Sequence, residues 1–350
     1  MDSWEVKRWL RLHLGSFKLY HLLRYSLNRR KAEEVIRKYG HNVDSKLLSL
    51  MKFAWINYHW NFDEFFLYDF MSLNHDEISS FVTEYDKNIF CDVVNDNTLD
   101  LVFHDKWQTY LKFNNYFCRD VCLLSNNKDL NSEAFISFIK KHNRFILKPV
   151  NAATGKGIEV VDCKNQNDCI RYLNTIIDSH GPCVAEELIN QHQLLAEYHP
   201  SSVNTVRITT FRYDSGDIDI IHPFIKFGQN GAFVDNGGQG GIICKIDPDT
   251  GIIIAAVDET PKQYIYHPDT NKKILGFKIP FWNEAVKLAK ELSNVIPQVR
   301  YVGWDLALTD AGWVMVEGNE KGMFIGFQLP TLTGFRTDFD SICNKAKVRI

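Results

Sequence analysis

Glycine is scarce in the first part of this 350-residue chain, where only Gly15 and Gly40 precede Gly155. A glycine-rich βαβ unit is therefore not expected at the start. Apolar residues spaced three and four apart instead predict helices from residue 1 to about 97. Long apolar runs are also missing. The longest, residues 252–257, is far too short to cross a bilayer.

Paired cysteines are absent as well. The chain has eight cysteines but no CxxC pair, and Cys118 and Cys122 have no matching histidine cluster. This pattern favours neither a zinc site nor a disulfide framework and is typical of a reduced cytosolic chain. A signal peptide is not expected either, because Arg8, Arg11 and His13 interrupt the N-terminal apolar residues. We therefore expect a cytoplasmic protein.

An excess of positive charge is missing too. The net charge of −3 excludes a uniformly basic nucleic-acid binder. Residues 1–40, however, carry a net charge of +6, while the other 310 residues carry −9. This basic segment has two interpretations. It is either an interfacial helix that contacts anionic lipid or a glycan-assembly partner, or a surface helix that packs on the acidic body.

Short strands and turn signals become frequent after residue 144. Asp-Ser-Gly and Asp-Pro-Asp-Thr-Gly join pairs of alternating apolar segments, which predicts hairpins. An α+β part therefore follows the helical part. The expected strands cover residues 144–150, 157–162, 183–189, 205–213, 217–227, 242–246, 251–257, 303–308 and 312–318, with helices at 167–180 and 282–296.

A strand that delivers Lys148 precedes a loop of small residues containing Lys156. Small residues let backbone N–H groups approach phosphate oxygens, and lysines supply positive charge. The segment is not a P-loop, because Val150 and Gly157 occupy positions that the P-loop reserves for Gly and Ser/Thr. An ordinary hairpin is the alternative interpretation.

Three oxygen-bearing side chains belong to one expected hairpin near the C-terminus. Glu317 and Asn319 are two residues apart and share a face, and Asp305 on the preceding strand can point the same way. Such a group suits a hard cation such as Mg²⁺. A polar hairpin face without a metal is the alternative.

Other charged residues stand in or at the ends of apolar strands. Arg207 lies inside one and needs a phosphate, a carboxylate or a structural ion pair as partner. Glu186 and Glu187 end another strand and point to opposite faces, beside a cleft or in solvent. Residues 235–241 hold four glycines and form either a cover over a substrate or a surface loop.

The order of these motifs resembles the ATP-grasp superfamily over about residues 100–335. The closest resemblance is to the sugar-transfer-associated ATP-grasp group, whose Ser-Val-Asn-Thr-x-Arg stretch is similar to residues 202–207 and whose Gly-Trp-Asp is similar to Gly303-Trp304-Asp305. The resemblance implies two α+β subdomains that grip ATP, preceded by a mainly helical region. The implied division is 1–100, 101–340 and a tail at 341–350.

The resemblance also implies roles for single residues. Lys106 and Lys148 would be the two lysines that contact ATP, and Glu186 would accept from the adenine amino group. The backbone of Leu188 would contact the adenine ring, next to Glu187, and Gln193 would contact the ribose. The remaining implied roles are a phosphate lid formed by Thr154, Gly155, Lys156 and Gly157, a γ-phosphate contact from Arg207, and binding of one or two Mg²⁺ (or Mn²⁺) ions by Asp305, Glu317 and Asn319.

The activity implied is an ATP-dependent carboxylate–amine ligase with an acylphosphate intermediate, in which Arg207 and Lys156 are catalytic. By analogy with the group, its substrates would be an amino acid and a sugar or sugar nucleotide in surface-polysaccharide biosynthesis. The chain has no GxSxG or Cys-His signature, as expected when no covalent enzyme intermediate forms. Two alternatives remain: a phosphotransferase on the same fold, and a nucleotide-binding accessory protein of a glycan assembly complex.

Overall fold

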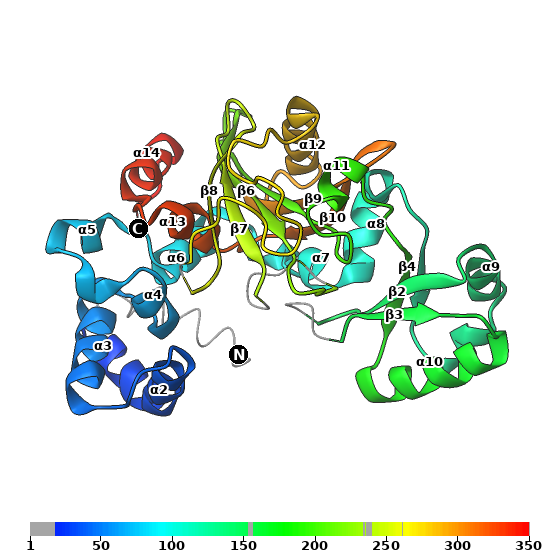
Figure 1. The fold of residues 1–350 in the computed structure, drawn as a ribbon, viewed down its shortest axis with the longest axis horizontal. Helices are drawn as coiled ribbons and strands as arrows, with labels where there is room; N and C mark the ends of the chain where they lie inside the picture. Colours follow the sequence, from blue (N-terminus) through cyan, green and yellow to red (C-terminus); the bar gives the residue numbers. More distant parts are fainter. Residues whose placement is uncertain (1–17, 153–156, 234, 236–239, 261, 350) are drawn as a thin grey trace.

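A computed structural model of the chain describes residues 18–152, 157–233, 235, 240–260 and 262–349. Figure 1 shows a larger sheet between a group of N-terminal helices at one end and a smaller sheet with its helices at the other. None of the described helices combines the length and the apolar composition that crossing a membrane requires.

Several of the N-terminal helices start at strong caps. Asn61, Asn74 and Thr83 each form a capping box, in which the cap side chain and an acidic side chain exchange bonds with backbone N–H groups. These bonds satisfy N–H groups that a first helical turn leaves unpaired. The elements are α2 (Lys18–Lys38), α3 (Ser45–Tyr58), α4 (Phe62–Leu67), η1 (Phe70–Ser72), α5 (His75–Ser80), α6 (Glu84–Val94) and η2 (Asn97–Leu99).

The smaller sheet is antiparallel throughout, in the order β1-β4-β2-β3. Phe145 from the sheet packs with Phe135 and Leu173 from two covering helices. The elements between residues 101 and 187 are α7 (Leu101–His104), α8 (Lys106–Phe117), β1 (Val121–Leu124), η3 (Asn127–Asn131), α9 (Glu133–Lys141), β2 (Arg144–Pro149), β3 (Glu159–Asp162), α10 (Gln166–His180) and β4 (Cys183–Glu187). Of these, α7 and α8 pack on the larger sheet.

The larger sheet is also antiparallel, in the order β10-β9-β5-β6-β7-β8. Bulges interrupt the pairing of β5 with β6, of β7 with β8 and of β9 with β10. The elements are α11 (Gln193–Ala196), β5 (Val206–Arg212), β6 (Ile218–Phe227), β7 (Ile242–Ile246), β8 (Ile253–Val257), α12 (Trp282–Ser293), β9 (Tyr301–Thr309), β10 (Gly312–Asn319), α13 (Ile325–Gln328), η5 (Leu329–Thr331) and α14 (Arg336–Ala346).

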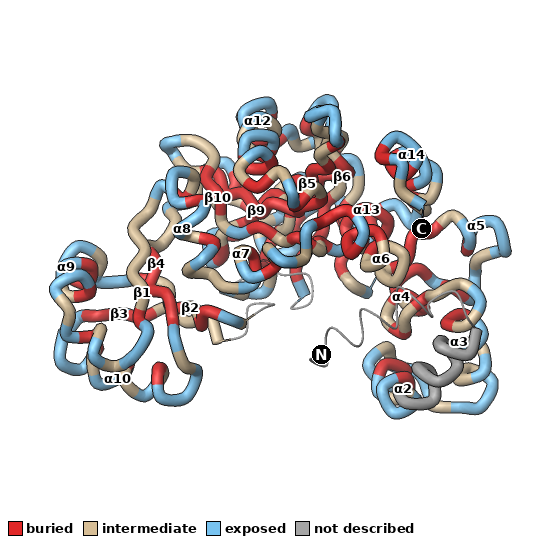
Figure 2. Tube along the Cα trace, turned by 180° about the vertical axis from the view of Figure 1, so that it is seen from behind, coloured by how far each residue is buried: buried red, intermediate tan, exposed pale blue. Residues whose placement is uncertain are grey.

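Both faces of the larger sheet are covered, and Figure 2 shows its strands mostly buried. On one face Phe211 of β5 contacts Phe90 of α6, with ring centroids 5.3 Å apart, and Phe90 contacts Phe339 of α14 at 5.2 Å. On the other face Trp304 of β9 packs in a core that includes Ala285 of α12. The N-terminal helices therefore share a hydrophobic core with the larger sheet.

A buried glutamine adds polar bonds to this junction. The Gln328 side chain accepts from the backbone N–H groups of Val82 at 2.9 Å and Phe335 at 3.1 Å, and donates to the carbonyl of Val82 at 2.9 Å. These bonds join the loop between α5 and α6 to the C-terminal helices. The expected domain boundary at residue 100 falls between η2 and α7 and stays a prediction.

The α+β fold with a helical N-terminal region is confirmed, and the expected strands occur with ends shifted by a few residues. One strand, β1, was missed, because four apolar residues have too little periodicity to mark a strand.

Part of the basic N-terminal segment, residues 1–17, lies outside the described residues. In the described part, Ala32, Val35 and Ile36 of α2 are buried, and Lys38 Nζ bonds to Asp63 Oδ1 at 2.8 Å. This end of the segment therefore packs on the protein itself. Contact of residues 1–40 with a membrane or a partner stays a prediction.

Candidate active site

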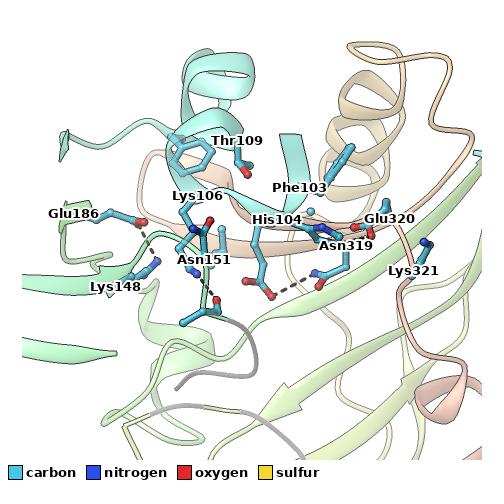
Figure 3. Close-up of a pocket in the computed structure, with 15 residues that line it drawn as sticks. Phe103, His104, Lys106, Thr109, Lys148, Asn151, Glu186, Asn319, Glu320 and Lys321 are labelled. Carbon is cyan, nitrogen blue, oxygen red and sulfur yellow. Dashed lines mark hydrogen bonds and ion pairs between the residues drawn. The ribbon is translucent and has the colours of Figure 1, made fainter. Parts of the chain in front are cut away.

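A cavity of about 330 Å³ lies where α7 and α8 meet residues of β2, β4 and β10 (Figure 3). Phe103, Phe117 and Val316 form apolar parts of its wall. The remaining wall is rich in charge. The ionisable side chains that line the cavity are His104, Lys106, Lys148, Glu186, Glu317, Glu320 and Lys321.

Glu186 is a buried carboxylate on the wall formed by the smaller sheet. Its Oε2 accepts from Lys148 Nζ at 2.9 Å and from Arg119 Nε at 3.1 Å and Nη2 at 3.0 Å. Burial alone would raise the pKa of Glu186, but the positive charges of Lys148 and Arg119 outweigh this effect and lower it to about 2. Glu186 is therefore ionised at neutral pH.

Arg119 is a site residue that no sequence motif predicts. Besides Glu186, its guanidinium donates to the carbonyl oxygens of Met315 at 2.7 Å and Phe117 at 3.1 Å. It thereby joins α8, β4 and β10 around the cavity. No local pattern marks this arginine, because Glu186 and Met315 lie 67 and 196 positions away along the chain.

Lys106 lies at the first position of α8 and points into the cavity (Figure 3). Its Nζ donates to the carbonyl oxygens of Pro149 at 3.0 Å and of Ala152. Burial lowers the pKa of Lys106, and the positive charge of Lys148 lowers it further, although Glu317 acts in the opposite direction. The structure thus brings the two predicted ATP lysines into one cavity.

The predicted phosphate lid is only partly described. Thr154, Gly155 and Lys156 lie outside the described residues. Gly157 has a φ of +70°, and a Cβ there would lie 2.9 Å from Cγ of Pro149. Only glycine adopts this conformation readily, so Gly157 permits the turn that starts β3.

Glu317, Asp305 and Arg207 form a row across three strands of the larger sheet. Glu317 of β10 pairs in register with Asp305 of β9, which pairs with Arg207 of β5. The Arg207 guanidinium bonds to both oxygens of Asp305, from Nε to Oδ1 and from Nη2 to Oδ2 at 2.6 Å. Arg207 Nη2 also lies 3.9 Å from Glu317 Oε1.

Asp305 has a second cationic partner, because Lys226 of β6 donates to Oδ2 at 3.1 Å. Burial alone would raise the pKa of Asp305, but Arg207 and Lys226 lower it well below its usual range. The pKa of Arg207 is raised: burial opposes this, and Asp305 outweighs burial. Lys226 was not predicted, although a lysine inside an apolar strand is the same signal that marked Arg207.

The two motifs of the sugar-transfer resemblance position this row. Asn204 donates to the carbonyl oxygens of Leu195 at 3.0 Å and His199 at 3.1 Å, which fixes the start of β5. Gly303 faces Arg207, and a Cβ there would lie only 2.9 Å from Arg207 Cδ. The glycine of Gly-Trp-Asp therefore leaves room for the arginine that holds Asp305.

The donor set fits a hard cation. Glu317 and Asn319 line the cavity, and 51% of the Glu317 side chain is exposed. Asn319 Nδ2 donates to Glu317 Oε1 at 3.3 Å, which leaves the amide oxygen for a cation. With Asp305, all donors are oxygens, which suit Mg²⁺ or Mn²⁺ better than Zn²⁺. Asp305 would have to exchange a bond with Arg207 or Lys226 to bind such an ion.

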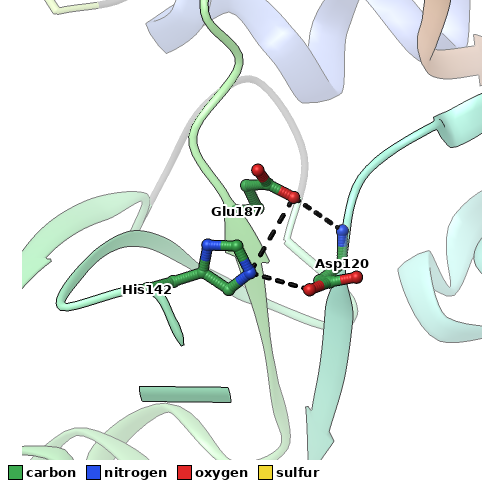
Figure 4. A group of neighbouring side chains, drawn as sticks. All are labelled: Asp120, His142 and Glu187. Carbon is green, nitrogen blue, oxygen red and sulfur yellow. Dashed lines mark hydrogen bonds and ion pairs between the residues drawn. The ribbon is translucent and has the colours of Figure 1, made fainter. Parts of the chain in front are cut away.

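Glu187 does not line this cavity. It points to the other side of β4, where Oε2 accepts from the backbone N–H of Asp120 at 3.0 Å and lies 3.9 Å from His142 Nε2 (Figure 4). His142 also bonds to the Asp120 carboxylate at 2.7 Å. Leu188 lines a second cavity of about 260 Å³, which Glu187 also lines.

Gln193, predicted near the ribose, begins α11, and its side chain bonds to Glu197 Oε1 at 3.1 Å. It lines neither of the two described cavities. The structure therefore does not place Gln193 beside the predicted ATP-binding residues that line the first cavity.

Comparison with known families identifies a match over most of the chain. A family model described as sugar-transfer associated ATP-grasp matches residues 85–344. These residues include the described cavity and the row formed by Glu317, Asp305 and Arg207. A search of curated proteins found no match.

Solved structures with similar folds have low sequence identity to this chain. The D-alanyl-alanine synthetase A of Vibrio cholerae is 10% identical, with a TM-score of 0.43 over 70% of this chain and 65% of its own. An N5-carboxyaminoimidazole synthetase of Staphylococcus aureus complexed with ADP is 13% identical, with a TM-score of 0.40 over 73% and 59%. An ADP complex of an N5-carboxyaminoimidazole ribonucleotide synthetase is 12% identical, with a TM-score of 0.41 over 63% and 45%. The chain thus spans about half to two thirds of these proteins.

Proposed function

This chain belongs to the sugar-transfer-associated ATP-grasp family, and we propose that it is an ATP-dependent carboxylate–amine ligase that releases ADP. One observation supports this proposal best: a single cavity holds the two lysines Lys106 and Lys148 and the oxygen donors Glu317 and Asn319. Phosphoryl transfer from ATP requires this combination of cations for phosphate oxygens and ligands for a divalent ion.

In the proposed nucleotide site, Glu186 and Lys148 act as a pair. The three bonds from Lys148 and Arg119 all reach Oε2 of Glu186, so Oε1 is the oxygen that the adenine amino group would donate to. Lys148 and Lys106 would contact phosphate oxygens. The bonds from Lys106 to two backbone carbonyls hold its ammonium at the start of the loop between β2 and β3.

The proposed reaction has two steps. A carboxylate oxygen of the substrate forms a bond to the γ-phosphorus of ATP, while the bond to the bridging oxygen breaks and its electron pair stays on ADP. An amine then attacks the acyl carbon, and phosphate leaves with the proton that the amine loses. Arg207 would neutralise charge on the transferred group.

Glu317, Asn319 and Asp305 would hold Mg²⁺, which when bound neutralises phosphate charge during the transfer. Neighbouring side chains already orient or ionise these ligands in the absence of an ion. The bond from Asn319 orients Glu317, and Arg207 with Lys226 keeps the carboxylate of Asp305 ionised.

For the substrates we propose an amino acid and a sugar or sugar nucleotide, joined during surface-polysaccharide assembly at the cytoplasmic side. The test is to measure ADP release with Mg–ATP across panels of amino acids, uronate sugars and sugar nucleotides, singly and in pairs. Release that depends on both a carboxylate and an amine supports a ligase. Release with one substrate and a stable phosphorylated product would identify a phosphotransferase instead.

A variant pair tests whether the chain is an enzyme at all. Glu317→Ala should abolish ADP release, whereas Glu291→Ala, at an exposed position of α12, should leave it unchanged. A wild-type chain that binds Mg–ATP but releases no ADP with any pair would favour the accessory-protein alternative.

A further inference from the structure

Lys226 is a largely buried charge between two apolar residues of strand β6. Its neighbours Ile225 and Phe227 are fully buried, and the lysine side chain is only 14% exposed. Removing an ammonium group from water is costly unless carboxylates compensate it. An apolar residue would avoid this cost, so the ammonium group of Lys226 is expected to have a role of its own.

Two carboxylates face the ammonium of Lys226. Asp305 Oδ2 accepts from Nζ at 3.1 Å, and Asp235 Oδ1 lies 3.9 Å from it. Asp235 is itself fixed, because its Oδ2 accepts from the backbone N–H of Thr205 at 2.7 Å and from the Thr205 hydroxyl at 2.6 Å. Lys226 is thus held between an anchored loop residue and the row of Glu317, Asp305 and Arg207.

The need to neutralise the charge of Asp305 does not by itself explain why a lysine occupies position 226. Arg207 already bonds to both oxygens of Asp305, so Lys226 is a second cation on a carboxylate that has a complete partner. Arg207 also reaches to within 3.9 Å of Glu317, which lines the cavity. Two cations therefore lie together at Asp305, and one of them is within 3.9 Å of Glu317, a residue that lines the cavity.

Building on the proposed function, we propose that Lys226 is a further catalytic residue whose ammonium binds oxygens of the phosphoryl group as it passes from ATP to the substrate carboxylate. The ligand class is a phosphate or an acylphosphate. A divalent cation bound by Glu317 and Asp305 would weaken the attraction of Asp305 for Lys226. The ammonium is then available to the transferred group, and Asp235 keeps it at this position. The bond changes are those of the first step above, and Lys226 donates hydrogen bonds without losing a proton.

The experiment uses inorganic phosphate as the probe, because phosphate is the group that remains after amide formation. The full-length protein is saturated with Mg–ADP and titrated with phosphate by calorimetry. We compare the wild type with Lys226→Met, Lys226→Arg and Lys245→Met. Lys245 is the control: it is half-buried on the neighbouring strand β7, where its Nζ lies 3.4 Å from the Thr331 hydroxyl.

Lys226→Met should weaken phosphate binding at least tenfold and leave the affinity for Mg–ADP within about twofold of the wild type. Lys226→Arg should retain most of the phosphate affinity, and Lys245→Met should retain all of it. Equal phosphate binding by the wild type and Lys226→Met overturns the inference. The inference is also overturned if the wild-type protein saturated with Mg–ADP binds no phosphate.

The failure of the proposed function has a different signature, because a wild-type chain that binds no Mg–ADP refutes both proposals at once. Should Lys226→Met not fold, as judged by its thermal unfolding, Lys226→Gln takes its place, since its amide can still bond to Asp235 and Asp305. The same tenfold loss is expected for that variant, and an unchanged affinity overturns the inference.

Discussion

Arg207 and Asp305 are cross-strand neighbours in β5 and β9, and the guanidinium binds the carboxylate at two points, with Nη2 at 2.6 Å from Oδ2. This geometry needs a planar fork of N–H donors, which lysine lacks. Arg207 also lies next to Glu317, which lines the cavity, so a substitution of Arg207 should alter the charge around Glu317.

Replacing this arginine should slow the chemical step. We expect Arg207→Lys to lower kcat for ADP release by about 10²-fold, a typical loss when one donor to developing charge is removed. The control is Arg212→Lys at the end of the same strand, where Arg212 bonds to Asn294 at 3.3 Å. Steady-state rates at saturating Mg–ATP measure both variants. Equal rates for Arg207→Lys and the wild type would contradict a role at the transferred phosphate.

A single methyl group at Gly303 should disturb the same arginine. The added Cβ of Gly303→Ala would lie 2.9 Å from Arg207 Cδ, so the arginine has to move away from Asp305. We expect a fall in kcat of about tenfold or more, since small misplacements in an active site are costly. Gly322→Ala is the matched control, because its Cβ would meet its nearest atoms at an ordinary 3.5 Å. If both alanines behave alike, the space at Gly303 has no special role.

Removal of Lys148 should weaken nucleotide binding. Lys148→Met deletes one of the two cations on Glu186 and one of the proposed phosphate contacts. We expect the Kd for Mg–ADP to rise about 10- to 100-fold, which corresponds to roughly 1.4–2.8 kcal/mol. Lys164→Met, at a position that is 84% exposed, serves as the control in the same titration. An unchanged Kd for Lys148→Met would place the nucleotide elsewhere.

The stability of the N-terminal region should depend on pH through Glu64. Burial, followed by repulsion from Glu84, raises the pKa of Glu64 from 4.5 to about 8 in the folded protein. A raised pKa means that the folded state holds its proton more tightly than the unfolded state. The stabilisation is complete below about pH 4.5 and is lost as the pH rises to about 8. The Tm should therefore fall across this interval.

Glu64→Gln provides the comparison for this pH dependence. The amide cannot accept from both backbone N–H groups that now bond to the carboxylate, those of Asn61 at 2.8 Å and Glu84 at 2.7 Å. Its Tm should be lower than that of the wild type at pH 5, but it should change less between pH 5 and pH 8. A variant whose Tm changes with pH as steeply as that of the wild type would exclude Glu64 as the source. Circular dichroism during heating measures both proteins.

Much of the fold was predictable because its signals are local. Hairpins such as β5–β6 and β9–β10 follow from alternating apolar residues around short polar turns, and the helical N-terminal region follows from its apolar spacing and lack of glycine. The proximity of Asp305, Glu317 and Asn319 was also predictable, since two adjacent strands carry them, while their binding of a metal ion stays a prediction. Arg119 was not, because no local pattern joins it to Glu186 and Met315.

The sequence by itself determined the order of the motifs, the family resemblance that the family model then confirmed, and which residues had the chemistry to bind phosphate or a hard cation. Only the tertiary structure decided how these charges are paired. The pairing of strands β10, β9, β5 and β6 brings Lys226 to a carboxylate 79 positions away and lets Arg207 reach Asp305 and Glu317. The tertiary structure also turned Glu187 of the smaller sheet away from the cavity and joined the N-terminal helices to the larger sheet in one core. Such contacts depend on strand register and on the packing of distant segments, and neither is encoded in the spacing of neighbouring residues.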